Sequence, residues 1–63
     1  MTSGRKRIEE LMAQLERQRA RLEGVRERAR EQGGPEGERL EKQATARLRD
    51  IDRRIEALRA SLG

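Results

Sequence analysis

Cysteine, histidine and aromatic residues are all absent from this chain of 63 residues. Without cysteine there is no disulfide and no thiolate ligand, and without histidine as well the usual zinc ligand sets are excluded. Without aromatic rings there is no platform on which the bases of a single-stranded nucleic acid would stack. Because so small a domain is usually marginal without such staples, we expect self-association to supply stability.

Long apolar runs are missing too. The longest is Leu11-Met12-Ala13, whereas a helix that crosses a bilayer needs roughly 20 apolar residues. Charged residues make up 44% of the chain, and 16 Lys and Arg against 12 Asp and Glu give a formal net charge of +4. We therefore expect a soluble, cytoplasmic protein with no membrane partner and a general, salt-sensitive preference for anionic partners.

What the chain does contain is a mirror-like order of apolar residues about Pro35, its one proline. Six pairs stand at nearly equal distances from this point: Ile8 with Leu62, Leu11 with Leu58, Leu15 with Ile55, Leu22 with Leu48, Val25 with Ala44, and Ala29 with Leu40. Two antiparallel helices joined by a short turn would bring every pair to the same height. The order therefore predicts an all-α fold, an antiparallel two-helix hairpin.

The apolar residues also repeat every seven positions, as in a coiled coil. In the first half the a positions are Ile8, Leu15, Leu22 and Ala29, and the d positions are Leu11, Gln18, Val25 and Gln32. In the second half Leu48, Ile55 and Leu62 take a, while Ala44, Ile51 and Leu58 take d. A stripe this narrow favours a coiled-coil seam over a thick helical bundle.

The segment Gly33-Gly34-Pro35-Glu36-Gly37 interrupts the repeat. Gly33 suits the left-handed position after a helix, and Pro35 suits the first turn of the next one. We predict helices at 5–32 and 36–62 and a turn at 33–35, with Ser3 and Gly63 as candidate caps. Self-association could then produce a domain-swapped dimer with 33–37 straightened, or a four-helix assembly of closed hairpins.

Gln18 and a row of arginines are the candidate partner-binding residues. A buried amide without partners costs about 1–3 kcal/mol, so Gln18 indicates a register device, a hydrogen-bonding partner helix, or a side chain that bends out to water. In an antiparallel pair e faces e and g faces g, which places Arg19 opposite Asp52 on one edge. The other edge carries Arg21, Arg28, Arg47 and Arg54, partly neutralised by Asp50. Such a row suits the acidic surface of a protein, phosphates, or solvent alone.

Catalysis is not expected from this inventory. Tyrosine is absent together with histidine and cysteine, and Ser3 and Ser61 stand near opposite ends of the chain. Acid-base catalysis would need a carboxylate whose pKa is raised by burial, and the carboxylates lie outside the predicted a and d positions. No cofactor or metal is expected either.

Three stretches carry a resemblance to a known family: Glu9-Glu10-Leu11, Ala29-Arg30-Glu31-Gln32-Gly33, and Arg54-Ile55-Glu56-Ala57-Leu58. They resemble the N-terminal coiled-coil domain of the Gre family of bacterial transcript-cleavage factors. The resemblance implies a hairpin that enters the secondary channel of RNA polymerase, with two acids at its tip that help to hold magnesium. Gly34 and Gly37 stand at those two positions here, so the cleavage activity is not carried over, although Glu36 and Glu38 keep the tip acidic.

The sequence thus leaves three functions open. We expect a non-catalytic interaction or regulatory protein, a homo-oligomer that binds itself or a protein partner through its Leu/Ile seam. One alternative is a transcription regulator that binds the RNA polymerase channel without stimulating cleavage. The other is a basic helical protein that binds nucleic acid.

Overall fold

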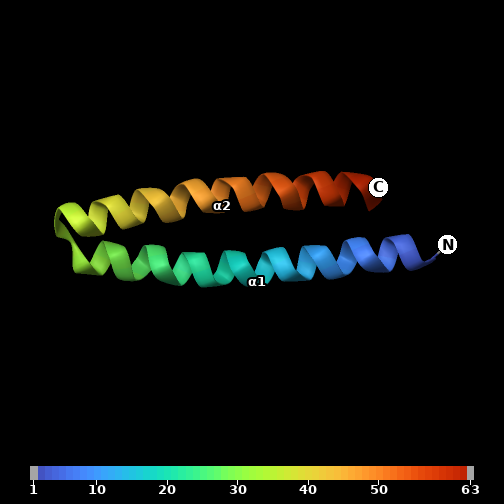
Figure 1. Ribbon diagram of the computed structural model, residues 1–63, viewed down its shortest axis with the longest axis horizontal. Coiled ribbons are helices and arrows are strands. Elements are labelled where there is room, and N and C mark those ends of the chain that lie inside the picture. Colours follow the sequence, from blue (N-terminus) through green and yellow to red (C-terminus); the bar gives the residue numbers. More distant parts are fainter. Residues whose placement is uncertain (1, 63) are drawn as a thin grey trace.

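The computed structural model describes residues 2–62, with side chains from residue 4 onward. The predicted cap Gly63 lies outside the described residues. Ser3 lies within the first helix, which begins at Thr2 and not at the predicted residue 5, so Ser3 does not stand at its N-cap. The chain forms two helices, α1 (Thr2–Gln32) and α2 (Gly34–Leu62). They run side by side in opposite directions, with both ends of the chain at the same end of the molecule (Figure 1). The Cα positions span 51 × 15 × 11 Å. The predicted all-α hairpin is confirmed, and its shape is a thin rod.

The turn between the helices is very short, because Gly33 alone separates them. Its N–H donates to the Ala29 carbonyl at 3.1 Å, which ends α1, and its carbonyl accepts from the Gly37 N–H at 3.2 Å, which begins α2. Gly33 and Gly34 have φ values of 68° and 71°, a region that disfavours side chains. The second helix therefore starts two residues before the predicted Glu36, since Pro35 fits a first turn whose N–H groups need no helical partner.

Gly37 brings the two helices into close contact beside the turn. It is buried, and a Cβ added to it would stand 2.6 Å from the carbonyl oxygen of Ala29. Ala29 is itself only 3% exposed. The helices approach one another here to a distance that only glycine permits.

The core is small and lies mostly on α2. Its buried apolar residues are Ala29, Ala44, Leu48, Ile51 and Ile55. The last four occupy the a and d positions predicted for the second helix, and Leu58 and Leu62 continue them as half-buried residues. No helix within residues 2–62 is both long and apolar enough to cross a membrane. The Leu/Ile seam of α2 is thus covered by α1 of the same chain.

The seam of α1 differs from the prediction, because its d positions face outward. Leu11 and Val25 are 40% and 36% exposed, and Gln18 is exposed as well. Met12 and Arg26, which occupy e positions, are half-buried in their place. On α1 the a positions and two of the e positions are therefore more buried than the d positions.

The reason for this rotation is the composition of the d positions. Burying Gln18 and Gln32 without partners would cost about 1–3 kcal/mol each. With α1 turned toward e, both amides are exposed and Met12 is half-buried. Of the three interpretations of Gln18, its side chain takes the one that bends out to water.

Candidate protein-binding groove

A shallow groove runs between the helices on the side of their g positions, and we call it the g-side groove. It is built from two adjoining hollows that share Gln18 and Arg54. From α1 it is lined by Leu11, Gln14, Leu15, Gln18, Arg21 and Leu22, and from α2 by Arg47, Asp50, Ile51, Arg54, Ala57 and Leu58. Both helices thus contribute one bank each along much of the rod.

Exposed apolar side chains follow this groove. The exposed large apolar residues of the described chain are Leu11, Val25 and Leu40. Leu11 lines the groove directly. Val25 stands seven residues after Gln18, and Leu40 stands seven residues before Arg47, so helical periodicity places both along the same side. We call these three residues the apolar stripe.

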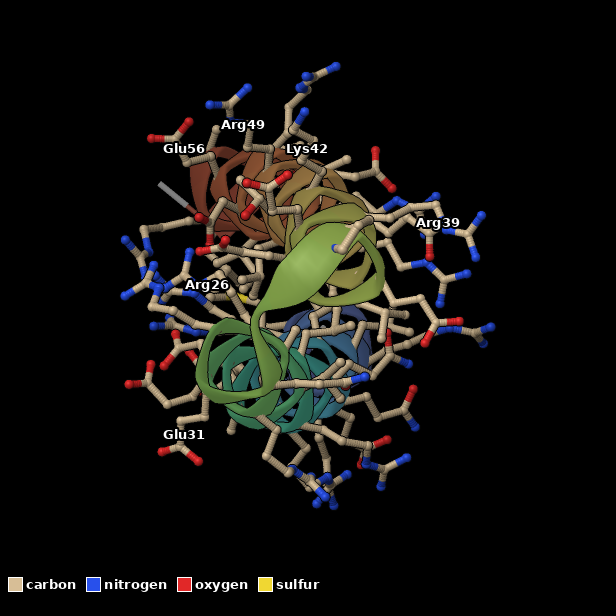
Figure 2. The ribbon with its side chains drawn as sticks, turned by 90° about the vertical axis from the view of Figure 1, so that its left-hand side faces the viewer. Arg26, Glu31, Arg39, Lys42, Arg49 and Glu56 are labelled. Carbon is tan, nitrogen blue, oxygen red and sulfur yellow. The ribbon has the colours of Figure 1, made fainter. Side chains whose placement is uncertain are left out.

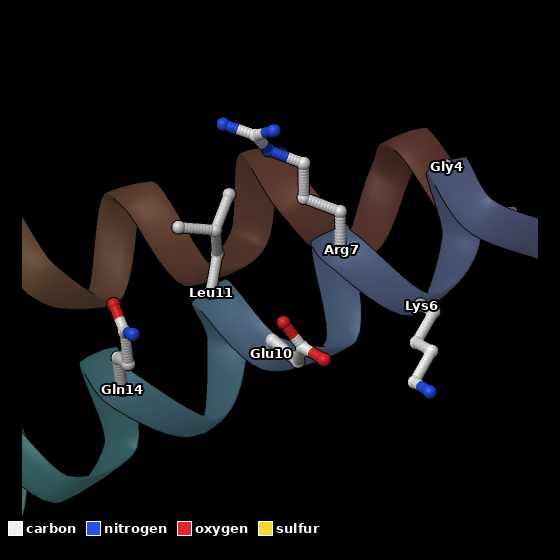
Figure 3. Close-up of a pocket in the computed structure, with 6 residues that line it drawn as sticks. All are labelled: Gly4, Lys6, Arg7, Glu10, Leu11 and Gln14. Atoms are coloured by element: carbon white, nitrogen blue, oxygen red, sulfur yellow. The ribbon is translucent and has the colours of Figure 1, made fainter.

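The N-terminal end of α1 shows how the stripe meets its polar neighbours. Leu11, Arg7 and Gln14 project from the same side of the helix, whereas Lys6 points away from it (Figure 3). Together with Gly4 and Glu10 they border a further shallow hollow. Leu11 therefore stands beside both this hollow and the g-side groove.

Three of the four arginines of the predicted row line the groove, namely Arg21, Arg47 and Arg54, whereas Arg28 does not. Arg21 and Arg47 line the same hollow, in keeping with their expected juxtaposition. Arg54 pairs with Asp50 at 3.2 Å, and both side chains are more than half exposed. No ion pair of Arg21 or Arg47 occurs among residues 4–62. Arg28 donates from Nε to the carbonyl of Gly24 in its own helix at 3.5 Å.

The opposite side of the rod, with the e positions, has a different character, and we call its concavity the e-side hollow. Arg19 pairs there with Asp52 at 2.9 Å, as predicted. The hollow is lined by Glu16, Arg19, Ala20, Glu23, Asp52, Ile55, Glu56 and Arg59. Four carboxylates thus face two guanidinium groups, which makes this hollow acidic.

Arg26 lies on the e-side flank, between the helices, whereas Arg39 projects on the opposite flank (Figure 2). Lys42, Arg49 and Glu56 point outward from α2, and Glu31 points outward from α1 (Figure 2). The Nε of Arg26 is buried and has no hydrogen-bond partner among the described residues. Charges therefore surround the rod, and Arg26 holds a buried nitrogen on its e-side flank.

The tip of the rod carries acids in two kinds of environment. Glu36 and Glu38 are exposed. Glu41 lies on the heptad row that continues to Leu48, and it accepts a hydrogen bond from Arg30 Nε at 2.9 Å with a side chain only 30% exposed. This hydrogen bond and then the charge of Glu41, with help from Glu27, raise the pKa of Arg30 above its ordinary value. The prediction that all carboxylates lie outside the seam was therefore wrong at Glu41.

The side chains of the groove offer apolar contact and charge-assisted hydrogen bonding. Among the described residues no three His, Cys, Asp or Glu side chains gather as metal ligands would. The exposed Ser61 hydroxyl donates to the carbonyl of Ala57 in its own helix at 3.2 Å. An apolar stripe flanked by arginines instead has the composition of a recognition surface.

Comparison of the chain with protein-family models, with curated proteins and with solved structures gives no match. The groove is therefore the feature from which we infer a function. Sequence reasoning placed Gln18 and the arginines but missed the apolar stripe beside them. The available signal was the glutamine at every second d position of α1, which opposes burial of that whole row.

Proposed function

We propose that the protein is a non-catalytic interaction protein that receives a further helix in its g-side groove. The exposure of Leu11, Val25 and Leu40 along one line carries this proposal. α2 has its seam covered by α1, so the apolar stripe takes the place of the Leu/Ile seam as the binding surface. Leu11 and Val25 are 14 residues apart, which is about 21 Å along a helix, a length that three or four turns of a partner would match.

A helix suits this groove better than an extended peptide does. Strand addition needs an exposed sheet edge with free backbone N–H and C=O groups, whereas α1 and α2 use these groups within their own helices along nearly their whole length. A helix needs only a row of apolar side chains at heptad spacing and a channel between two ridges. The g-side groove is such a channel; Leu11 lines it, and Val25 stands two heptads further along the same row of α1.

Site-specific photo-crosslinking tests the proposal. A photoreactive amino acid replaces Gln18, which lies in the groove, and in a matched variant it replaces Arg53, which is exposed and lines neither the groove nor the e-side hollow. In native cell extract we expect crosslinks from position 18 to the apolar face of a helical segment. The double substitution Leu11→Ser and Val25→Ser should abolish them. Equal crosslinking at position 53, or none at position 18, would contradict the proposal.

The two alternatives raised by the sequence predict other products in the same experiment. A nucleic-acid binder would give nucleotide adducts at position 18, and these would vanish as salt rises. A binder of the RNA polymerase channel would crosslink from a third variant, which carries the photoreactive amino acid at the exposed Arg39 beside Glu36 and Glu38, and not from position 18. The identity of the crosslinked molecule and position therefore separates the three functions.

A further inference from the structure

We infer that the partner in the g-side groove is an acidic amphipathic helix of another protein, and not a second copy of this chain. The inference rests on the proposed function, because it names the chemistry of the helix that the groove receives. It follows from comparing the charge and the apolar exposure of the two sides of the rod.

The g-side groove is basic as well as apolar. Its central hollow holds the guanidinium groups of Arg21, Arg47 and Arg54 against the single carboxylate of Asp50. Asp50 is already paired with Arg54. The forked guanidinium group binds carboxylates through two parallel hydrogen bonds, so Arg21 and Arg47 are suited to Glu or Asp side chains beside the apolar stripe.

A second copy that docks through its own g side would cover the stripe but would oppose like charges. Two apolar stripes would meet, and the arginine rows that flank them would lie within a Debye length of about 8 Å at physiological salt. Each row could find few carboxylates on the other copy, because Asp50 is the only acid that lines the groove. Such a dimer would bury the apolar stripes but would leave the arginine rows repelling one another.

A second copy that docks through its e side would have the converse defect. The e-side hollow carries four carboxylates and would complement the arginines. However, the exposed large apolar residues of the described chain all belong to the stripe on the g side. The e side of a second copy therefore has no apolar row of its own with which to cover the stripe. A helix with its own apolar row and Glu or Asp on both flanks supplies the two properties together.

Two synthetic helices provide the test. Both are about three heptads long, with Leu and Ile at a and d, and they differ only at e and g, which are Glu in one peptide and Gln in the other. Each is labelled and titrated with the whole protein while fluorescence anisotropy is recorded. We expect the Glu peptide to bind about tenfold more tightly than the Gln peptide at about 50 mM salt, and most of this advantage to disappear at about 300 mM.

Two charge variants locate the effect. Arg21→Glu with Arg47→Glu should remove the preference for the Glu peptide. Arg49→Glu with Arg53→Glu changes the net charge equally on exposed parts of α2 outside the groove and should preserve it. Circular dichroism of both variants confirms that they remain helical. If both variants lose the preference for the Glu peptide equally, the inference is wrong, because the attraction would then depend on net charge and not on the groove.

The remaining outcomes are also decisive. Equal binding of both peptides, abolished by Leu11→Ser with Val25→Ser, would overturn the acidic partner and leave the proposed function standing. Failure of both peptides together with absent crosslinking at position 18 would overturn both. If the protein alone sediments as a dimer that the same two serine substitutions dissociate, a second copy fills the groove and the inference is wrong.

Discussion

At the scale of single residues, Gly37 shows how one hydrogen atom sets the geometry of the tip. A Cβ at this position would stand 2.6 Å from the Ala29 carbonyl oxygen, a backbone atom that cannot rotate away. That oxygen also accepts the N–H of Gly33, so a shift of the backbone would disturb the hydrogen bond that ends α1. The tip therefore depends on the absence of a side chain at Gly37.

We predict that Gly37→Ala destabilises the protein by about 1–3 kcal/mol, as overpacking at a well-packed site does. Gly24→Ala is the matched control, because its added Cβ would meet only the end of the Arg28 side chain, at 3.9 Å. Alanine is the better helix former, so this control should gain up to about 1 kcal/mol. Urea unfolding followed by circular dichroism measures the free energy of unfolding of both variants. If both substitutions stabilise the protein, the close approach of Gly37 to Ala29 is wrong.

At the scale of the element, the rotation of α1 decides which residues stabilise the hairpin and which remain free. We predict that Met12→Ala costs about 1–2 kcal/mol, since Met12 is half-buried. Leu11→Ala, one residue away and 40% exposed, should cost less, about 0.5–1 kcal/mol. Ile51→Ala, at a site 6% exposed, gives the scale of a full core loss, about 2–4 kcal/mol. A larger loss of stability from Leu11→Ala than from Met12→Ala would contradict the rotation of α1 and indicate that its a and d positions pack against α2.

The turn is the second element whose chemistry can be tested. A left-handed conformation costs a residue with a side chain about 1–2 kcal/mol, and Gly33 and Gly34 both adopt it. We predict that Gly33→Ala with Gly34→Ala favours a straightened connection, still interrupted at Pro35, and hence a domain-swapped dimer. Light scattering should then find the dimer at lower protein concentration than for the unaltered chain. A variant that stays monomeric and equally stable would contradict this account of the turn.

The sequence predicted the helices, the turn and the α2 seam because each rests on a strong local signal. Pro35 and Gly33 mark the break, and Ile51 and Ile55 repeat with a clean heptad spacing. No such local signal predicts the rotation of α1. The rotation depends on the cost of burying two amides compared with the gain from burying one methionine, and this comparison requires the positions of both helices. The same holds for the groove: the arginines could be assigned to one edge, but the apolar stripe beside them became visible only with the rotation.

At the scale of the whole molecule, the hairpin has a small core for its length. The buried apolar residues of the described chain include two alanines, Ala29 and Ala44, and no aromatic ring. The ion pair between Arg19 and Asp52 joins half-exposed side chains, and such pairs contribute about 1 kcal/mol or less. A ligand that binds only the folded state therefore has a large relative effect on stability.

Because the core of the hairpin is small, a bound helix has two possible places: on the closed hairpin, or against α2 in place of α1. The distance between spin labels at Glu16 and Glu56 distinguishes them, because both positions line the e-side hollow, away from the groove. We predict a short distance between the labels within one chain, unchanged when the Glu peptide is added and when an excess of unlabelled protein is present. The a and d residues of α2 stay covered in that case, and the arginines of both helices remain together as banks of one groove. A long distance after adding the peptide would mean that the partner displaces α1, and a short distance lost on mixing with unlabelled protein would mean that the helices pair between chains.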